Sequence, residues 1–479
     1  MVAERTSSLH GIAPLGERQE YPPSSCYAER MYVVIVGAGE VGYYIATILS
    51  QEGHDVAIVD RDSESYQRVA EQLDVLAIRG NGASRRVLER VNMSRADLLI
   101  AVTDSDEVNM IACMAAKRGG VAQTIARVRN PDYIEDFQTM STGFTGVDHV
   151  IQPEAAVADE VAKLAAIPGV LDVETFAGGQ VWVLEAQVGP EAPCVGKALR
   201  DFGLPEGVVV TSILRDTGTT IPRGDTVFAA SDRVFLAGRP DVASRAVSLL
   251  TGEMEAPKRA ILLGCGEIGM GIALALEKQR MKLTIFEKDH DRASEAAGQL
   301  RRALVLEDEG LDESILAEEG VGTADLFIAA TGDDRLNIIS ALMAKNMGAK
   351  RTIAIVERGE FSRVVESVGV DVAISPRRMT ASAVLRFIRA GQIMSAAVLE
   401  KSAGEVLEFV VSASSPACGP PLAQVRFPPG VIVGAVVRDD QVHVPDGRFQ
   451  LADGDVAVVF TLPKSVREVE KLFAPRTRA

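Results

Sequence analysis

The sequence predicts a mixed α/β protein: two Rossmann-like domains with doubly wound parallel sheets, each followed by a small α+β domain. Two observations lead to this fold class. Short apolar stretches alternate with helical stretches, and the same succession of motifs occurs twice along the chain. A chain of 479 residues is also too long for one compact core, and its length suggests three or four domains.

The repeat begins with two glycine-rich loops, GAGEVG from Gly37 and GCGEIG from Gly264, each of which follows an apolar run. Further on, ADLLIAVTDSDEVN from Ala96 matches ADLFIAATGDDRLN from Ala324, and IQPEAAV matches ISPRRMT. Near the end of each copy, GVVVTSILRDTGTTIPRGD is echoed by GVIVGAVVRDDQVHVPDGR. Self-similarity of this length indicates two copies of a two-domain unit.

Each copy starts with strand-like runs, which in the first copy are YVVIV, VAIV, VLAI, LLIAV, TIARV and HVI. After each glycine loop, apolar residues recur at helical spacing, and the alternation of strand and helix indicates a buried parallel sheet. The later strands, such as VWVLEAQV and DRVFLAG, are separated by Gly, Pro and Asp. They predict a small, mostly β domain with a helix such as VGKALRDF, reached through a helical connector.

These patterns divide the chain into seven segments. We expect a disordered tail (1–30), a first Rossmann-like domain (31–150), a linker helix (151–167), a small α+β domain (168–252), a second Rossmann-like domain (257–375), a second linker helix (376–392) and a second small domain (393–475).

Composition excludes several classes of function. The net charge of −16 argues against a nucleic-acid partner, which needs a basic face. The five cysteines form no CxxC or metal-ligand spacing, so we expect small buried residues in a reducing compartment and no metal site. No apolar run approaches the ~18 residues that span a bilayer.

The first loop has the setting of a dinucleotide site, with strand, loop, helix and a carboxylate, Asp60, at the end of the second strand. Gly37 permits the tight turn, Gly39 leaves room for a pyrophosphate, and Gly42 lets the helix approach the sheet. Asp60 suits ribose hydroxyls and disfavours a 2′-phosphate, so NAD fits better than NADP. ATP or ADP presents the same ribose, and the alternative is that the glycines only make a turn.

The second loop has Glu287 in the place of Asp60, and Cys265 lies within it. After the third strand the first copy has RGNG, with Gly80 and Asn81, whereas the second has EDEG, in which Asp308 replaces the glycine and adds negative charge. The second site is therefore expected to bind more weakly or to hold a different nucleotide.

Residues at the ends of later strands are expected to face the crevice where the strand order reverses. Thr103 and Asp104 follow LLIAV, and Thr331 and Gly332 are their counterparts. Thr103 could also cap the following helix, either as an alternative or in addition to facing the crevice. Arg127 ends the next strand, where it could reach phosphate or simply lie at the surface.

The chain offers little for catalysis. An NAD-dependent oxidoreductase, the alternative function, needs an acid or base beside the nicotinamide and usually a separate substrate domain. Of the five histidines, His149 is the one candidate, and no acid motif accompanies it. No GxSxG, HExxH or P-loop pattern is present. We expect no enzyme and no catalytic residues, but a regulator that responds to nucleotide.

The combination GAGEVG, IVDRD, RGNGA, ADLLIAVTDSDEVNMIAC, ARVRNPDY and IQPE, followed by the repeat, resembles the TrkA family from Met31 to near the C-terminus. These are cytosolic regulatory subunits of bacterial Trk potassium uptake systems, built from RCK (KTN) domains. The resemblance implies tandem Rossmann-like RCK domains, each followed by a TrkA-C domain. Asp308 and the N-terminal tail depart from the family's pattern.

The resemblance further implies NAD or NADH, and ATP or ADP, as ligands. It implies a membrane-embedded Trk potassium channel subunit as partner, a ring-like homo-oligomer (a dimer or tetramer of tandem chains), and a peripheral location at the cytosolic face of the plasma (inner) membrane. The implied nucleotide contacts are Gly37, Ala38, Gly39, Glu40, Val41, Asp60, Asn81, Thr103, Asp104 and Arg127, and in the second copy Gly264, Cys265, Gly266, Glu267, Ile268, Glu287, Thr331 and Gly332.

Overall fold

The computed structural model of the chain describes residues 30–51, 53–130, 132–133, 146–252, 255–357, 365, 368–389, 393–399 and 404–475, and the side chains of 385–389 and 393–399 are not among what it describes. The expected disordered tail, apart from residue 30, lies outside the described residues.

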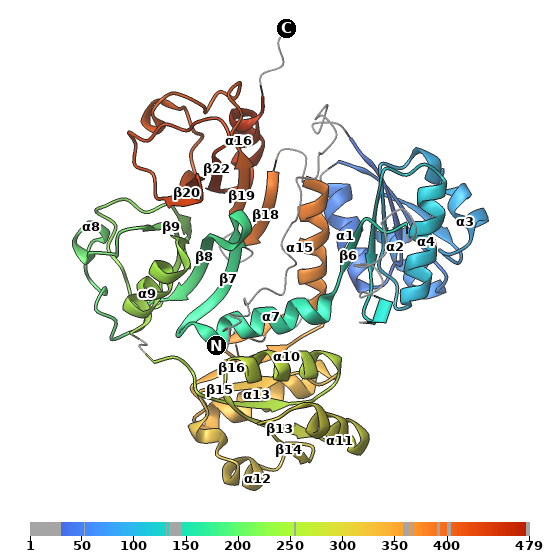
Figure 1. Cartoon of the computed structure of the whole chain (residues 1–479), viewed down its shortest axis with the longest axis horizontal. Coiled ribbons are helices and arrows are strands. Elements are labelled where there is room, and N and C mark those ends of the chain that lie inside the picture. Colours follow the sequence, from blue (N-terminus) through green and yellow to red (C-terminus); the bar gives the residue numbers. More distant parts are fainter. Residues whose placement is uncertain are drawn as a thin grey trace, which may run out of the picture.

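The first copy opens with a six-stranded parallel sheet in the order β3-β2-β1-β4-β5-β6, so the strand order reverses between β1 and β4. Helices cover both faces (Figure 1). The predicted Rossmann-like architecture is confirmed. Its strands are β1 (Tyr32–Val36), β2 (Asp55–Asp60), β3 (Leu76–Arg79), β4 (Leu98–Ala101), β5 (Gln123–Arg127) and β6 (His149–Ile151), and its helices are α1 (Glu40–Gln51), α2 (Ser63–Gln72), α3 (Arg85–Arg90) and α4 (Asp106–Arg118).

The second copy repeats this sheet in the order β14-β13-β12-β15-β16-β17, again parallel throughout. Fully buried strand residues such as Ile261 and Phe327 explain the near-continuous apolar runs in its sequence. The strands are β12 (Arg259–Leu263), β13 (Lys282–Glu287), β14 (Leu304–Glu307), β15 (Leu326–Ala329), β16 (Arg351–Ile355) and β17 (Val372–Ile374), and the helices are α10 (Glu267–Lys278), α11 (His290–Gln299), α12 (Glu313–Glu318) and α13 (Asp334–Met347).

The two small domains are built on five-stranded antiparallel sheets, β10-β9-β11-β8-β7 and β18-β19-β22-β20-β21. Of the helix expected over VGKALRDF, only its end is helical, as α8 (Leu199–Phe202), because Gly196 near the start of this segment has φ +78°, in the left-handed region; Gly203, also left-handed, then ends the helix. The remaining elements are β7 (Val170–Phe176), β8 (Val181–Gln187), β9 (Val208–Arg215), β10 (Gly218–Thr220), β11 (Arg233–Gly238), α9 (Pro240–Thr251), β18 (Ile393–Leu399), β19 (Gly404–Val410), β20 (Val431–Arg438), β21 (Gln441–His443), β22 (Val456–Thr461) and α16 (Val466–Phe473).

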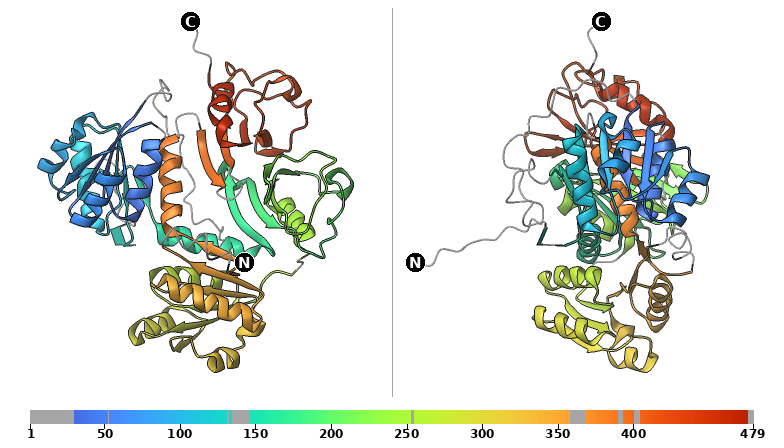
Figure 2. Two further views of the ribbon diagram at one scale, coloured as in Figure 1. Left: turned by 180° about the vertical axis from the view of Figure 1, so that it is seen from behind. Right: turned by 90° about the vertical axis from the view of Figure 1, so that its right-hand side faces the viewer.

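The linker helices, α7 (Pro153–Ala166) and α15 (Pro376–Arg389), cross from one copy to the other (Figures 1 and 2). Val157 and Val161 of α7 share a core with Ile272 of α10, in the second Rossmann-like domain. Ala381 and Val384 of α15 lie in the core of the first. Each connector therefore packs on the domain of the other copy, an arrangement that the sequence did not predict.

The two small domains also share a core. Val183 and Phe235 of the first pack with Val437, Val458 and Phe460 of the second. The four domains are thus linked by apolar contacts at three places, two through linker helices and one between small domains.

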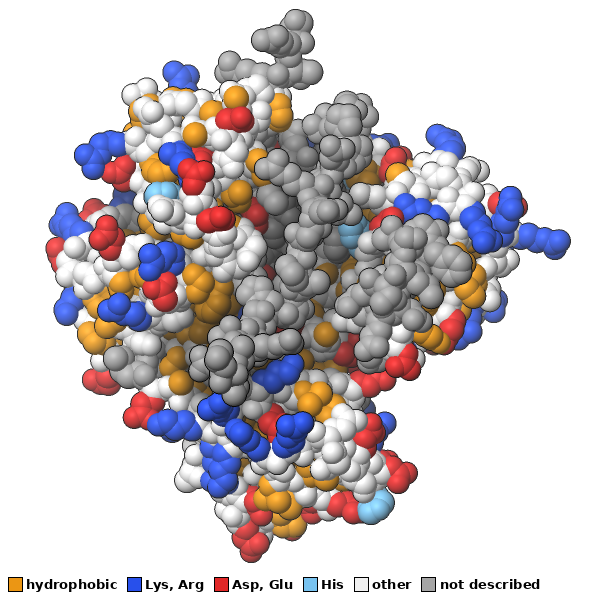
Figure 3. All heavy atoms as spheres, viewed as in Figure 1, with side chains coloured by type: hydrophobic (Ala, Val, Ile, Leu, Met, Phe, Trp, Pro, Cys, Tyr) orange, Lys and Arg blue, Asp and Glu red, His pale blue; other side chains and the backbone are white. Residues whose placement is uncertain are grey.

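On the face viewed in Figure 3, acidic and basic side chains are interspersed. Within the described part of the chain, no helix is both long and apolar enough to cross a bilayer.

Candidate nucleotide-binding sites

The first glycine loop is shaped by contacts that exclude side chains at two positions. Gly37 has φ +107°, and a Cβ there would lie 3.0 Å from the backbone nitrogen of Thr103. A Cβ on Gly42 would lie 1.8 Å from the carbonyl oxygen of Gly37, so only glycine permits α1 to start here. Around Gly39, by contrast, no atom lies within 4 Å of an added Cβ. The loop therefore leaves open space at the position where a pyrophosphate would approach the backbone.

Asp60 holds this loop from the end of β2. Its Oδ2 accepts a hydrogen bond from the backbone N–H of Ala38, and its Oδ1 accepts one from Asp62 at 2.7 Å. Each carboxylate oxygen has further acceptor capacity, which ribose hydroxyls could use. Asp62 in turn caps α2 through Ser65 at 2.8 Å.

The second loop has the same construction despite its longer carboxylate. A Cβ on Gly269 would lie 2.1 Å from the carbonyl oxygen of Gly264. Glu287 is 5% exposed, and it accepts hydrogen bonds from the backbone of Cys265 at 2.6 Å and of Asp289 at 2.9 Å. Burial, together with Glu287, raises the pKa of the Cys265 thiol to about 11, so this thiol remains neutral.

A buried asparagine fixes the strand ends beside each loop. Asn109 Oδ1 accepts from the backbone N–H and hydroxyl of Thr103 at 2.9 and 2.7 Å, and its Nδ2 donates to the carbonyls of Thr103 and Arg127. Asn337 makes the matching four bonds to Thr331 and Ile355. The cap of α4 is Ser105, so the alternative role of Thr103 as helix cap is wrong. The repeat contained both asparagines, but sequence reasoning gave them no role.

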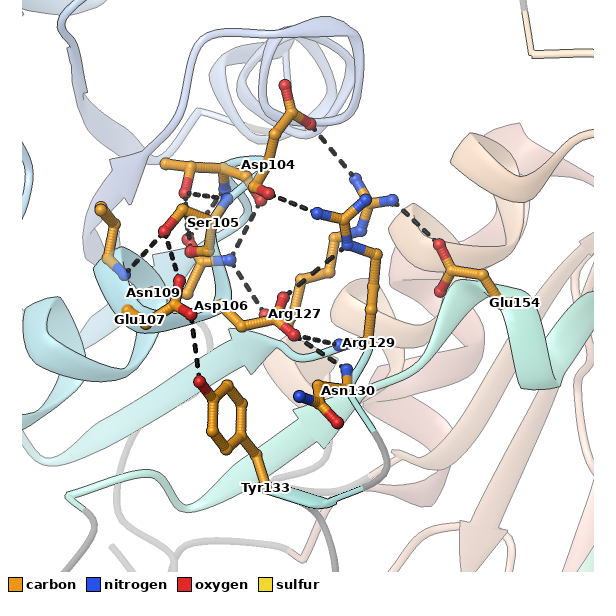
Figure 4. Close-up of polar contacts among 12 residues, drawn as sticks. Asp104, Ser105, Asp106, Glu107, Asn109, Arg127, Arg129, Asn130, Tyr133 and Glu154 are labelled. Atoms are coloured by element: carbon orange, nitrogen blue, oxygen red, sulfur yellow. Dashed lines mark hydrogen bonds and ion pairs between the residues drawn. The ribbon is translucent and has the colours of Figure 1, made fainter. Parts of the chain in front are cut away.

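Arg127 is not a surface arginine, because its side chain is only 16% exposed. Its Nη2 donates to Glu154 Oε1 at 3.1 Å, and Figure 4 shows Glu154 reaching it from the start of α7. Asp104 is 99% exposed and lies 3.9 Å from Arg127 Nη1. The backbone carbonyl of Asp104 accepts from Arg129, whose own N–H donates to Asp106 at 2.8 Å. This edge of the first site is therefore rich in arginine.

An ion-pair network at the start of α1 includes a residue of the other copy. Glu40 pairs with Arg68 of α2 at 2.7 Å and with Arg377 of α15 at 2.9 Å. The Arg68 guanidinium also lies 4.4 Å from the centre of the Tyr43 ring. Sequence reasoning missed Arg377, because nothing in the sequence showed which domain α15 would contact. It also missed Glu154, although Glu154 follows β6, the strand that pairs with β5 at Arg127.

The second site is a pocket of about 360 Å³ with an acidic lining. Glu287, Asp308, Glu309 and Asp333 line it together with two cations, Lys288 and Arg292. The backbone N–H of Asp308 donates a hydrogen bond to the carbonyl of Glu287, just as the N–H of Gly80 donates to the carbonyl of Asp60 in the first copy. The excess of carboxylates over cations in the lining disfavours a highly charged phosphate. Weaker binding at the second site than at the first stays a prediction.

The structure brings the sequence-predicted residues to one edge of each sheet, where the strands end. In the first copy, backbone hydrogen bonds join Gly37 to Val59, Gly80 to Asp60, and Val102 to Val36. His149 instead begins β6, so its backbone lies at the opposite end of that strand from the crevice. No group of three or more His, Cys, Asp or Glu residues able to hold a metal ion occurs among the described residues.

Family models match the chain along most of its length. The TrkA-N domain model matches residues 33–153 and 260–376, and the TrkA-C domain model matches residues 183–251 and 406–474.

Curated relatives align over nearly the whole chain. Trk system potassium uptake protein TrkA homolog 1 of Methanosarcina mazei is 40% identical over 451 residues, covering 92% of this chain and 100% of that protein. Trk system potassium uptake protein TrkA of Haemophilus influenzae is 32% identical, covering 93% and 99%.

Solved structures share the fold. The GsuK channel bound to NAD has a TM-score of 0.61 at 19% identity, covering 96% of this chain and 82% of that one. The GsuK RCK domain has a TM-score of 0.60 at 19% identity, covering 95% and 98%. At this level of identity the likeness concerns the fold alone.

Proposed function

The chain belongs to the TrkA family, and from that premise we propose that it is a cytosolic, nucleotide-sensing regulatory subunit of a Trk potassium uptake system. The observation that carries the nucleotide-sensing part is the contact between a glycine loop and a linker helix of the other copy, through Glu40 and Arg377. A ligand that binds at this loop has a direct route to a second domain.

The residues present fit an adenine nucleotide. The open space at Gly39 and the N–H groups at the start of α1 suit a pyrophosphate, and Asp60 suits the ribose. NAD or NADH and ATP or ADP share these groups, so we propose them as the ligands. The proposed contacts in the first site are Gly37, Ala38, Gly39, Glu40, Val41, Gly42, Asp60, Asn81, Thr103, Asp104 and Arg127, and in the second Gly264, Cys265, Gly266, Glu267, Ile268, Glu287, Thr331 and Gly332.

The mechanism follows from charge competition. A phosphate at the start of α1 competes with Glu40 for Arg68 and Arg377, and so changes how α15 is held. Because α15 leads into β18, the change reaches the second small domain. The nucleotide shifts the equilibrium only if it binds two domain arrangements with different affinity.

The partner in this proposal is a membrane-embedded Trk potassium channel subunit, contacted at the cytosolic face of the membrane. Tandem chains would form a ring-like homo-oligomer, and a change in angle between paired domains would then be transmitted to the pore. Co-purification of the tagged chain with membrane proteins, followed by potassium flux with and without nucleotide, tests this part. A flux that is the same at every nucleotide concentration would exclude the sensing role.

Ligand binding is tested by equilibrium dialysis with NADH, ATP and ADP. We expect Asp60→Ala to weaken binding at the first site by roughly tenfold or more, because charged hydrogen bonds contribute about 1.5–3 kcal/mol. Glu287→Ala should leave the first site intact and serves as its matched control. Equal affinities in the wild type and both variants would remove these carboxylates from the sites.

Turnover is tested separately. NADH absorbance is followed in the presence of candidate 2-oxo acids, and we expect no steady decrease. Steady oxidation of NADH would contradict the proposed regulator and favour an NAD-dependent oxidoreductase.

A further inference from the structure

The two small domains correspond residue by residue, and in each domain an arginine paired with a buried aspartate establishes the correspondence. Arg215 pairs with Asp232 at 2.6 Å in the first domain, and Arg438 pairs with Asp455 at 2.7 Å in the second. Both aspartates precede the strand that lies at the centre of each sheet.

Each domain has one further buried carboxylate, on a strand that pairs with the central strand. These carboxylates are Glu185 of β8 and Glu408 of β19, and they occupy corresponding positions when the two domains are aligned on Asp232 and Asp455. Beside Glu185 stands Arg233, the first residue of β11, which forms an ion pair with it. The first residue of β22, in the corresponding position beside Glu408, is valine, Val456. The second domain therefore keeps the carboxylate and lacks its arginine.

Glu408 is 4% exposed, and it accepts a hydrogen bond from the backbone N–H of Ala177 in the other small domain at 3.1 Å. Among the described residues no lysine, arginine or histidine forms an ion pair with it. Burial raises the pKa of Glu408, as expected for a carboxylate without a nearby cation. A buried carboxylate charge is unfavourable without a partner, and a well-placed cation that also donates hydrogen bonds would stabilise it.

A cavity of about 330 Å³ lies where the arginine is missing. Glu408 and Val456 line it, together with Asp439 and Asp440 of the turn after β20, and Ala177 and Gln180 of the other domain also line this open pocket. Gln180 donates to Asp440 at 3.3 Å, so both copies contribute to the walls. Three carboxylates and no basic residue line this space.

We propose that this cavity between the small domains binds a small organic cation carrying a guanidinium group, which takes the place that Arg233 occupies in the first domain. A guanidinium fits because its planar N–H groups pair with a carboxylate in the way that Arg233 pairs with Glu185. A directly bound metal ion fits less well, because the three carboxylates that line the pocket do not form a group that could hold one ion, and no such group occurs elsewhere among the described residues. Occupancy would tie the two small domains together, since each supplies part of the wall.

Isothermal titration of the full chain with agmatine at constant ionic strength tests the proposal. We expect saturable binding to the wild type, and a loss of about tenfold or more in affinity for Glu408→Gln, which removes the charge and keeps the shape. Val456→Arg supplies the missing guanidinium from the chain itself and should abolish binding. Asp216→Asn alters the turn after β9, the counterpart of Asp439, and should bind as the wild type does.

Two further arms make the result decisive. Titration with KCl and with MgCl2 should give no saturable signal that Glu408→Gln removes. Absence of agmatine binding to the wild type, binding unchanged in Glu408→Gln, or a metal-ion signal that depends on Glu408 would each overturn the proposal. Should Val456→Arg fail to fold, the comparison of wild type, Glu408→Gln and Asp216→Asn still decides.

Discussion

Two glycines of the first loop have different surroundings, so substitutions at them should have different effects. One substitution should affect the stability of the fold, and the other should affect nucleotide binding. A methyl group on Gly42 would collide with the carbonyl of Gly37, whereas a methyl group on Gly39 would enter open space. We therefore expect Gly42→Ala to destabilise the chain by about 2 kcal/mol or more. Gly39→Ala should leave stability within about 1 kcal/mol of the wild type and still weaken nucleotide binding at the first site.

Chemical unfolding and equilibrium dialysis of the same two variants check this prediction. The informative pattern is a stable Gly39→Ala protein that binds poorly. A Gly39→Ala protein that binds NADH, ATP and ADP with wild-type affinity would show that the nucleotide does not approach this part of the loop.

Short sequence motifs were enough to predict those site residues whose role depends only on the backbone conformation close to them in the sequence. The glycines and Asp60 are determined by one turn and one strand end, and the structure places them together. Arg377 could not be predicted, because its contact with Glu40 depends on how α15 packs against a domain distant in the sequence. Glu154 lies in the first turn of α7 directly after β6, the strand that pairs with the end of β5 at Arg127, so its contact is local to the first domain and was overlooked. The sequence pattern also could not show that Glu287, although longer than Asp60, would accept hydrogen bonds from the two equivalent backbone N–H groups of the second copy.

At the scale of elements, helical periodicity predicted both linker helices but not what they contact. An apolar stripe shows that a face is buried, and it carries no information on the partner surface. The contact between α7 and α10 is close at Gly271, where an added Cβ would lie 3.2 Å from the Cβ of Ala158. Gly298, in α11 of the same domain, has open space around it.

This contrast gives a matched pair of substitutions. Gly298→Ala should stabilise the chain by up to about 1 kcal/mol, because alanine has the higher helix propensity. Gly271→Ala should gain less or destabilise, because the same gain is opposed by crowding against α7. Urea unfolding of a double-mutant cycle with Ala158→Gly measures the coupling, for which we expect at least about 0.5 kcal/mol. A coupling of zero would contradict the close packing of α7 on α10.

The junction of α7 with β7 should make stability depend on pH. Burial, reinforced by Asp172, raises the pKa of Glu160 to about 8 from its ordinary value of 4.5, and it outweighs the opposing effect of Lys163, which lies 3.5 Å away. Between these values the folded chain holds a proton that the unfolded chain has lost, so this group's stabilising contribution is complete below pH 4.5 and falls as the pH rises toward 8.

We expect Glu160→Gln to remove this part of the pH dependence, which amounts to at most about 1.4 kcal/mol per pH unit. The variant should gain stability relative to the wild type between pH 5 and 8 in unfolding experiments. A stability difference that is constant over this range would show that Glu160 is ionised in the folded chain.

For the whole molecule, the sequence predicted the duplication and both sheet architectures but not the way the copies join. Repeated motifs reveal how many units a chain contains, and each sheet follows from its own strands and helices. The exchange of α7 and α15, and the core shared by Val183, Phe235 and Phe460 of the small domains, involve contacts between surfaces distant in the sequence. No local pattern encodes such contacts.

This mode of joining predicts that the two copies stay together without the peptide that connects them. Residues 1–252 and 257–479, produced together as separate chains with a tag on one, should co-purify as a 1:1 complex. The expected contacts are mainly apolar, so 1 M NaCl, which reduces the Debye length to about 3 Å, should not separate the halves. Light scattering after size exclusion measures the stoichiometry. If the halves separate at high salt, ion pairs such as Glu40–Arg377, rather than the shared cores, hold the copies together. If the halves never associate, the exchanged arrangement of the linker helices is contradicted.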